Sequence, residues 1–385
     1  MSTGLNPRRR IVIEGRDVAG LLADDVISVS VEDHVEDADA CTFEFTNRRG
    51  EWLDHPLFER GNRVEVFMGY GDRLAGLFDG LITVIEPHFP EDNVPTVTIT
   101  AYDKSYRMRK KGDADGSFPD MDANQIVRAI AKKYGFKESQ IMTPDEAPKR
   151  AFTSQESEDD WHFLRNLASS TGFEVYVESG KLYFRSGKRR PTSVEGVYRY
   201  GENLKSFEPS LSVEKPPTKV TVRGWDEKKK EAFEVAIPDD LSESERHVLG
   251  DQSASQVIED EFGESERILQ NVVAEDRNHA RDIALAYFTS KEYELVTAVG
   301  ACAGDPELRA KRLIAIAGVG TKFSGTYYLT RVTHTLDDSG YLCEFEAKRN
   351  AISRADLKRV REARKAQAQG YNVQILPTRY IGAGA

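Results

Sequence analysis

Apolar and polar residues alternate with a period of two through most of the first hundred positions. Short alternating runs, such as RVEVFMGYG (63–71) and PTVTITAYD (95–103), are separated by Gly, Pro and Asp residues. Short strands with turn residues at regular spacing are typical of a β-sandwich or β-barrel. The pattern therefore predicts a first antiparallel β-barrel over residues 1–111.

A polar stretch, RMRKKGDADGSFPDMD (107–122), ends this alternation and marks a domain boundary. After it, residues 122–135 have apolar side chains at the spacing of an amphipathic helix, with Asp122 as its cap and Gly135 as its stop. We therefore expect a small α/β domain over 112–200.

A second helix is predicted in SEDDWHFLRNLASSTG (157–172). Ser157 is the expected cap, with Asp160 as its capping-box partner, and Gly172 is the expected C-terminal glycine. The acidic residues Asp159 and Asp160 then lie in the first turn, where the helix dipole favours negative charge. This gives the acidic cluster a structural reason to exist, without a catalytic role.

The period changes back to two directly after this helix. Ser179-Gly180 predicts a two-residue hairpin turn, which fixes the register of the flanking strands. Val177 then lies opposite Leu182, and Val175 lies opposite Phe184 on the same side of the hairpin. That apolar side can receive the apolar face of the helix, so the segment is predicted to fold as a helix–hairpin unit.

The chain returns to β-type alternation after about residue 200. We predict a second β-barrel over 201–350, interrupted at 240–292 by a charged, partly helical insert. Residues 351–385 read as a charged helix followed by a tail. Ile375, Leu376 and Tyr380 in this tail are candidate docking residues, with simple disorder as the equal alternative.

The two β regions resemble each other as an internal repeat. In each, a strand ends in Gly-x-Gly, a Phe-x-Gly turn follows, and the next strand ends at a histidine, His88 or His334. The shared order favours a duplication. If each copy forms a barrel, three chains supply six barrels, and a threefold ring can imitate a sixfold one.

Composition narrows the possible functions. The 385 residues carry a formal net charge of −11, with 39% hydrophobic and 30% charged residues. No apolar run is long enough for a membrane span, and no secretory signal is visible. The three cysteines are far apart and argue against a disulfide framework or a zinc site, which fits a reducing compartment. The acidic balance makes nucleic acid an unfavourable primary partner.

Catalytic signatures are not found in the sequence. No phosphate-binding loop, nucleophile elbow, zinc-protease motif or calcium loop occurs, and no two histidines have metal-ligand spacing. We therefore expect no enzyme activity, no catalytic residue, no cofactor and no metal. The basic runs at 8–10 and 107–111 are interpreted as solvated loops or as salt-bridge partners of an acidic neighbour.

The helix–hairpin segment resembles the T-D-W-x-F-L-x-x-L-A…G-x-x-x-Y…G-x-L-x-F stretch of the phage late control protein D family. These are baseplate hub proteins of contractile phage tails and related injection systems, and they are similar to the N-terminal half of type VI secretion spike proteins. A second stretch, LRAKRLIAIAGVGTKFSGTYYLTRVTHTLDDSGYLCEFEAKRN (308–350), also resembles the family. Across both stretches, the motif residues are Asp160, Trp161, Phe163, Leu164, Gly172, Tyr176, Phe184, Gly325, Tyr327, His334 and Tyr341.

The resemblance implies a mainly β, α+β fold with two tube-like barrels, an intervening α/β domain and a C-terminal helix. It implies a homotrimer that joins a tail tube protein to a separate spike protein, with baseplate wedge proteins as further partners. Nucleic acid would pass only as transiting cargo, and no small-molecule substrate is expected. The particle would be a virion or injection-particle baseplate, assembled in the host cytoplasm.

One departure from the family and two alternative functions stay open. Relatives often have a glycine turn where this chain has Ala310-Lys311, so that loop is expected to differ. The first alternative is a carbohydrate- or receptor-binding tail accessory protein, which would need exposed aromatic residues in a groove. The second is a cell-wall hydrolase that uses Asp159 or Asp160 as its acid.

Overall fold

The computed structural model describes residues 6–22, 25–109, 116–145, 147, 152–186, 193–226, 229–241, 248–270, 274 and 276–352. The predicted C-terminal helix and the candidate docking residues Ile375, Leu376 and Tyr380 lie outside these ranges. Among the described helices, none is long and apolar enough to cross a membrane.

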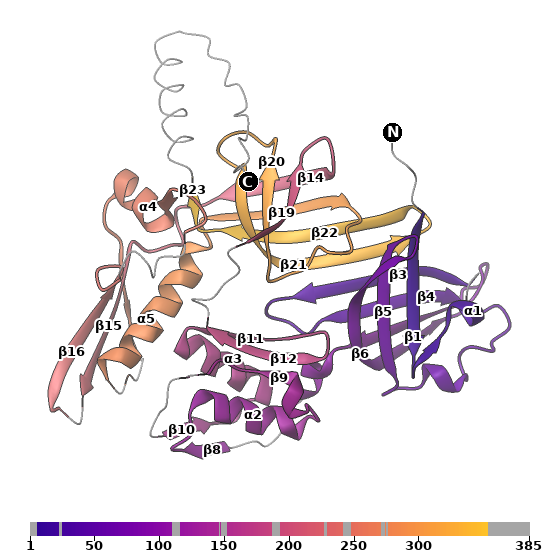
Figure 1. The fold of residues 1–385 in the computed structure, drawn as a ribbon, viewed down its shortest axis with the longest axis horizontal. Coiled ribbons are helices and arrows are strands. Elements are labelled where there is room, and N and C mark those ends of the chain that lie inside the picture. The colour runs from indigo at the N-terminus through magenta and orange to yellow at the C-terminus, as the bar shows by residue number, and fades with distance from the viewer. Residues whose placement is uncertain are drawn as a thin grey trace, which may run out of the picture.

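One large sheet of 13 strands contains strands from both β regions (Figure 1). The first half of this sheet has the spatial order β1-β5-β6-β7-β4-β3. Its strands are β1 (Pro7–Ile13), β3 (Val26–His34), β4 (Ala40–Thr46), β5 (Arg63–Tyr70), β6 (Arg73–His88) and β7 (Thr96–Tyr102). Short elements complete it: β2 (Arg16–Asp17), α1 (Ala19–Leu22), η1 (Pro56–Phe58) and η2 (Lys104–Arg109).

The second half of the sheet has the matching order β13-β20-β21-β22-β19-β14. Its strands are β13 (Val194–Arg199), β14 (Leu204–Leu211), β19 (Val296–Ala303), β20 (Leu313–Ala317), β21 (Gly325–Asp337) and β22 (Gly340–Arg349). Strand for strand, the chain order and the neighbours are those of the first half. The main difference is that β13 pairs with β20 in parallel, whereas β1 pairs with β5 in antiparallel fashion.

The two halves are joined by antiparallel pairing of β3 with β21, from Arg331↔His34 to Leu336↔Val29. The expectation of two tube-like antiparallel β-barrels is therefore not confirmed: the described strands form one continuous sheet. In the second half, the outer strands β13 and β14 approach each other only through the isolated bridge Tyr200↔Leu204. The mainly β character of the α+β fold is confirmed.

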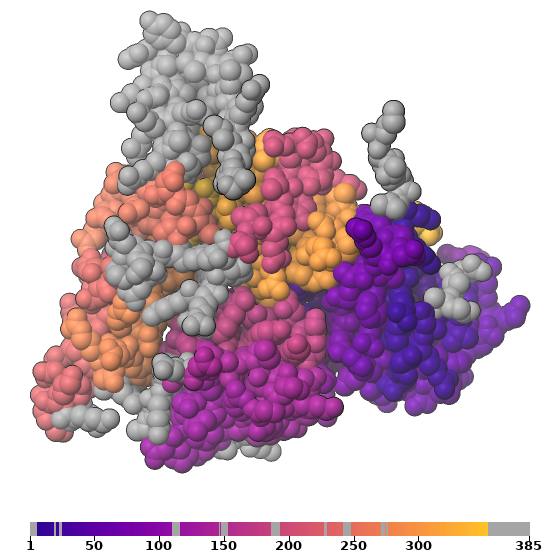
Figure 2. Space-filling model, viewed as in Figure 1, coloured from indigo at the N-terminus to yellow at the C-terminus, as the bar shows by residue number. Residues whose placement is uncertain are grey.

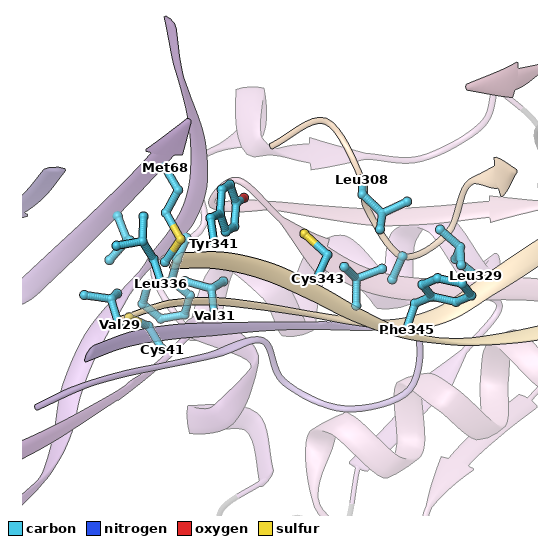
Figure 3. Packing of buried hydrophobic residues seen from close by; sticks show 14 of the residues in the cluster. Val29, Val31, Cys41, Met68, Leu308, Leu329, Leu336, Tyr341, Cys343 and Phe345 are labelled. Atoms are coloured by element: carbon cyan, nitrogen blue, oxygen red, sulfur yellow. The ribbon is translucent and has the colours of Figure 1, made fainter. Parts of the chain in front are cut away.

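The core of this sheet crosses the joint without interruption. A single buried cluster contains Val29 and Val31 of β3 together with Leu329 and Leu336 of β21. Figure 3 shows these side chains in one layer with Tyr341, Cys343 and Phe345 of β22. Because apolar burial is the main source of stability, the two halves form one structural body.

Two matched pairs of β-bulges show that the halves are structurally equivalent. In the first half, the register shifts at Thr83 in β6 and at Ile27 in β3. In the second half, it shifts at the corresponding places, Thr330 in β21 and Lys205 in β14. A strand does not need a bulge in order to pair with its neighbour. Two bulges at matching positions in both halves therefore support the duplication predicted from sequence.

The bulge threonines also make the same contact. Thr83 Oγ1 donates to the carbonyl oxygen of Thr100 at 3.1 Å, and Thr330 Oγ1 donates to that of Glu346 at 3.3 Å. Counting from these bulges, His334 corresponds to Pro87. The sequence comparison, which aligns His334 with His88, is therefore one residue out of register.

The α/β unit folds close to its prediction. Helix α2 (Ala123–Lys133) is capped by Asp122, whose carboxylate accepts a hydrogen bond from the Gln125 amide at 2.8 Å. Helix α3 (Asp160–Thr171) packs on the hairpin of β11 (Phe173–Glu178) and β12 (Lys181–Ser186). The smaller elements are β8 (Gly116–Pro119), η3 (Glu138–Gln140), β9 (Ile141–Met142) and β10 (Phe152–Gln155).

The insert between β14 and β19 is larger than the predicted 240–292. Strands β15 (Lys219–Asp226), β16 (Glu231–Ile237) and β18 (Glu266–Leu269) form a sheet of their own instead of joining the second half. Helix α5 (Arg277–Glu292) covers this sheet, with a separate buried cluster between them. The remaining elements are β17 (Gln252–Ser253), α4 (Ala254–Phe262) and β23 (Ala351–Ile352). Figure 2 shows the insert, in orange, on the opposite side of the molecule from the first half of the sheet.

Candidate functional site

Most motif residues of the helix–hairpin segment lie in the core of the α/β unit, whereas Tyr176 faces the other side of the hairpin. Trp161, Phe163 and Leu164 on α3 and Phe184 on β12 are all buried in one apolar cluster. Gly172 ends the helix in the left-handed conformation, with φ at +69°, a conformation that glycine adopts without steric cost. These residues position the unit, and they offer no surface for a substrate.

The two candidate acids have structural partners. The N-cap of α3 is Asp159 and not Ser157, since the Asp159 carboxylate accepts from the His162 amide at 2.9 Å. Burial raises the pKa of Asp159, but hydrogen bonds from His162 outweigh this effect, so the pKa lies below its ordinary value. Asp160 is buried and accepts from the Tyr134 hydroxyl at 2.8 Å and from the Gln155 amide nitrogen at 2.9 Å.

A groove lies between α3, α5 and β11, and it is not a hydrolase site built on these acids. Its lining includes Arg165, Gly172, Asp282 and Thr289, whereas Asp159 and Asp160 do not line it. Among the described residues, no cluster of His, Cys, Asp and Glu side chains is suited to hold a metal ion. The geometry therefore gives the hydrolase alternative no support.

The remaining motif residues lie at two separate places along β21 and β22 in the second half of the sheet. His334 is buried, with Nδ1 2.8 Å from the Tyr341 hydroxyl and Nε2 2.9 Å from the Leu308 carbonyl oxygen. Tyr327 is fully buried and donates to the Phe323 carbonyl oxygen at 2.7 Å. Gly325 has φ at +147°, which strains any residue other than glycine, and a Cβ atom there would come within 2.7 Å of the Arg349 guanidinium, which would have to shift. The motif residues of the α/β unit and those of the sheet are not brought together into one site.

Two cysteines that are distant in sequence meet beside His334. Cys302 and Cys343 lie directly opposite each other on β19 and β22, and both are free thiols. Hydrogen bonds from Cys302 and His334 lower the pKa of Cys343 to about 5, against the effect of burial. Because Cys343 is completely buried, its sulfur cannot reach a substrate, and the pair is part of the core.

A buried charged junction lies where three parts of the molecule meet. Lys311, in the loop before β20, is fully buried, and its Nζ lies 2.5 Å from Asp33 Oδ1 on β3 and 3.8 Å from Asp39 Oδ1. The same ammonium lies 5.1 Å from the ring centre of Tyr176 on β11. Lys311 therefore links the first half of the sheet, the second half and the α/β unit.

Hydrogen bonds around the junction hold its carboxylates in place. Asp33 also accepts from the Ala310 amide at 3.0 Å, and Asp103 accepts from the Asp39 amide at 2.9 Å. Burial raises the pKa of Asp39 well above its ordinary value, although Lys311 opposes this effect. Burial lowers the pKa of Lys311, but Asp33 and Asp39 outweigh it and raise the pKa above the ordinary value. One buried ammonium thus compensates a group of acids.

The sequence alone does not predict this junction, although Ala310-Lys311 stands out in it as a departure from the family pattern. Lys311 has φ at +68°, the left-handed region in which glycine is favoured. The backbone thus adopts a glycine-type turn even though the residue is lysine, and the strained residue supplies the buried charge. Strain of this kind persists only where surrounding contacts fix it. The Ala310-Lys311 departure from the family pattern was the available signal.

Besides the free sides of β13 and of residues 7–11 in β1, each half of the sheet has a further edge that no described strand covers. In the first half it is the C-terminal part of β6, where residues 84–88 pair only with β7. In the second half it is β14, which pairs only with β19. Uncovered edges present backbone donors and acceptors, and they are natural sites for adding a strand.

The face of the sheet opposite the core is polar across the joint. One row of cross-strand neighbours, from β22 to β6, crosses the joint. In order, it consists of Leu342, Thr335, Ser30, Thr42, Thr100 and Val84. The next rows add the carboxylates of Glu32, Glu44, Glu86 and Glu344 on the same face. The surface is therefore made mostly of hydroxyl and carboxylate groups.

Three arginines of the two basic runs pair with acids of the same chain, whereas Lys110 and Lys111 lie outside the described residues. Arg8 and Arg10 form ion pairs with Asp72 and Asp17, at 3.5 and 2.7 Å. Arg109 pairs with Asp37 at 3.0 Å. These arginines therefore have intramolecular partners, so they do not form a free cationic patch for phosphate groups.

Exposed aromatic residues do not gather in a groove. The exposed aromatic side chains that the structure describes are Phe89, Tyr106, Tyr200, Trp225 and Phe262. Three of them lie on η2, β15 and α4, and Phe89 and Tyr200 directly follow β6 and β13. Tyr327 and Tyr328 are buried. A carbohydrate site built on stacked rings has no support in this arrangement.

Solved structures with this fold are phage tail and type VI secretion proteins. The 43 kDa tail protein of prophage MuSo2 from Shewanella oneidensis matches with a TM-score of 0.66 at 14% identity, covering 89% of this chain and 98% of its own. A tail protein from Neisseria meningitidis MC58 matches with a TM-score of 0.63 at 11% identity, over 90% and 98% of the two chains. At these identities the match establishes the fold alone.

A third solved structure belongs to a secretion system. The E. coli c3393 protein, described as a type VI secretion component with similarity to the T4 tail proteins gp27 and gp5, has a TM-score of 0.55 and 13% identity. The match covers 89% of this chain and 77% of that one. These folds agree with the kind of protein that the sequence resemblance implied.

A search of curated proteins finds no match. One family model, that of the Alg8 N-terminal domain, matches residues 8–338. It is a different family model from phage late control protein D, which the sequence resembles, so that particular assignment is not confirmed. Since the matched model spans most of the chain, the protein belongs to the Alg8 N-terminal domain family.

Proposed function

We propose that the protein is a structural, non-enzymatic hub of a phage tail or related contractile injection particle. Three copies form a ring that presents six equivalent half-sheets to a hexameric tail tube on one side. The other side receives a trimeric spike, and wedge proteins bind around the ring. This function is the one implied by the resemblance to phage late control protein D.

The duplication of the sheet is the observation that carries this proposal. The two halves repeat the same strand order, and they share the bulges at Thr83 and Thr330 and at Ile27 and Lys205. A chain with two equivalent halves is suited to match threefold and sixfold symmetry, because three copies give six similar units. The fold shared with phage tail proteins supports the same role.

The polar face supports a lumen for transiting cargo. Hydroxyl groups and carboxylates, such as those of Thr335, Ser30 and Glu32, cover this face on both sides of the joint. A wall of this kind repels phosphate groups electrostatically and offers few apolar contacts. Nucleic acid would therefore pass without being held, in accord with the net charge of −11.

The mass of the purified chain in solution tests the proposal first. We expect light scattering over a dilution series to show a species of three times 43.2 kDa at high concentration, in equilibrium with monomer. A stable dimer, or an open series of larger species, would contradict a threefold ring. A chain that stays monomeric at every concentration, and also with candidate tube and spike proteins added, would count against the hub function.

A further inference from the structure

The joint between the two halves also shows what should cover the free edges. Within the chain, β3 at the edge of the first half pairs with the C-terminal part of β21 in the second half. The structural equivalent of β3 is β14, and the equivalent of that part of β21 is residues 84–88 of β6. Both equivalents are free of described strands.

We propose that β14 of one copy pairs with the C-terminal part of β6 in the next copy, so that the contact between subunits repeats the joint within each subunit. This inference rests on the proposed ring, for which it names the contacting edges. The occupant of these two edges is therefore a second copy of this chain, and the interface is head-to-tail.

The equivalence fixes a register for this contact. In the internal joint Val332 lies opposite Asp33, Thr333 opposite Glu32 and His334 opposite Val31. The matched bulges give the equivalent of each residue in these pairs: residues of β21 correspond to residues of β6, and residues of β3 correspond to residues of β14. The equivalent pairs place β6 of one copy opposite β14 of the neighbouring copy. The expected pairs are Ile85 with Leu211, Glu86 with Ser210 and Pro87 with Pro209.

Burial gives a second, independent reason for this contact. At the internal joint, Val332, Val31 and Asp33 are at most 4% exposed. The equivalents on the free edges are apolar yet uncovered: in β6 Ile85 is half-buried and Pro87 exposed. Their proposed partners, Leu211 and Pro209, are half-buried.

Other apolar residues along the two edges are also less buried than residues at the internal joint. Ile85, Phe207 and Leu211 pack at the border of the same core that crosses the internal joint. Phe89, directly after β6, is 65% exposed, while its equivalent Leu336 is 5% exposed. A second copy would extend the core over these side chains, which removes apolar surface from water.

Two prolines make the proposed contact weaker than the internal one. The Val35 amide donates to the Thr330 carbonyl oxygen at 3.0 Å, and alternation along the strand then directs the backbone groups of Val332 and His334 toward β3. Their equivalents Ile85 and Pro87 face the free edge. Pro87 and its proposed partner Pro209 lack the amide hydrogen, so two ladder hydrogen bonds cannot form.

Proline at an uncovered edge also limits unwanted pairing of free subunits. Pro87 and Pro209 thus keep the edges of free subunits from associating strongly in solution. The remaining contacts between the edges still stabilise the complete ring. This explains why the edges can be apolar and uncovered in a single chain without forming open-ended sheets.

Disulfide trapping tests the register directly. Glu86 and Ser210 form a pair without ladder hydrogen bonds, in which the Cα atoms of opposite residues are about 4.5 Å apart, within reach of a disulfide. In a Glu86→Cys/Ser210→Cys variant, we expect oxidation to link neighbouring chains into a ladder on a denaturing gel. The three native cysteines are buried and should not contribute.

The matched control uses the internal joint. Thr333→Cys/Glu32→Cys occupies the equivalent pair within one chain, so it should form a disulfide without a change in mass. Mixing the two single variants, Glu86→Cys and Ser210→Cys, should give dimers and no longer products. Trapping in the control but not in the Glu86/Ser210 variant, at concentrations where the chain is trimeric, would overturn the proposed edges and leave the ring intact.

The length of the ladder separates this inference from the proposed function. Products that end at three linked chains agree with both. A ladder that ends at another number, or that continues, would support the edge pairing but refute the threefold ring. A chain that remains monomeric and yields no interchain product, also with candidate tube and spike proteins added, counts against both.

Replacing the prolines gives a readout that does not depend on cysteine. A Pro87→Thr/Pro209→Val variant restores two amide donors at the proposed contact, and we expect the concentration of half-assembly to fall by roughly tenfold or more. Unchanged association would mean that these positions lie outside the interface, since added donors would then face water.

Discussion

Replacing Lys311 with Met is expected to lower the free energy of unfolding by about 3–5 kcal/mol, because it leaves buried carboxylates without their cation. Asp33 and Asp39 are at most 9% exposed, and the Lys311 ammonium is the positive charge closest to both. The Asp33 carboxylate would lose its strongest partner, at 2.5 Å. The penalty falls on the contact between β3 and β21, which joins the two halves.

The measurement should show where in the structure stability is lost as well as how much is lost. A chain with several buried clusters need not unfold in a single transition, so one unfolding free energy is incomplete. Amide hydrogen exchange of β3, β20 and β21 reports the joint itself. We expect faster exchange in these strands, with the separate sheet of the insert unchanged. Uniformly unchanged exchange would contradict the role assigned to the buried ion pair.

Companion variants separate charge from backbone strain. Lys311→Gly also removes the charge, so it should still destabilise the protein. Because glycine suits the φ of +68°, the loss should be smaller than for Lys311→Met. Adding Asp33→Asn to Lys311→Met should recover part of the loss, because it removes one uncompensated charge and keeps an acceptor for the Ala310 amide. Lys229→Met is the surface control, since its ion pair with Asp226 has a largely exposed lysine.

Replacing Trp161 with Ala is expected to destabilise the α/β unit by about 3–5 kcal/mol, the usual cost of removing a large buried aromatic side chain. Trp161 is 1% exposed and packs in the cluster between α2, α3 and the β11–β12 hairpin. The Arg109 guanidinium lies 5.5 Å from its ring centre, which adds a contact from η2. The loss should appear in the exchange of α2, α3 and the hairpin.

The chain offers a matched control for this prediction. Trp225 on β15 is 53% exposed, and its replacement by Ala should change the stability by less than about 0.5 kcal/mol. Thermal unfolding of both variants gives the comparison. A Trp161→Ala melting curve that superimposes on that of the unmodified protein would mean that the indole is not part of the core of this unit.

Local sequence was sufficient for the elements of the α/β unit. The turn at Ser179-Gly180 has positive φ at both residues, and the predicted pairs Val177↔Leu182 and Val175↔Phe184 are present. The hairpin register depends on a two-residue turn, which is a local property. The position of the helix cap was two residues out, because two acids and a serine in succession offer several competing acceptors.

Long-range pairing determined the features that local patterns could not show. The repeat was visible in the order of short strands, but the true register depends on bulges at Thr83 and Thr330, which have no local signature. Alternation predicts that Tyr176 faces away from the helix, which is correct. It does not predict that this face is also buried, against Lys311 at the junction.

The sequence by itself determined a mainly β chain with a duplicated strand order and an α/β unit between the copies. These features depend on periodicity, caps and turns, whose energetics are set within a few residues. Only the tertiary structure decided that β3 and β21 merge the copies into one sheet, that Lys311 compensates acids about 270 residues away in the chain, and that equivalent edges remain uncovered. Those outcomes depend on which strands meet, because burial and strand pairing join residues without regard to their separation in sequence.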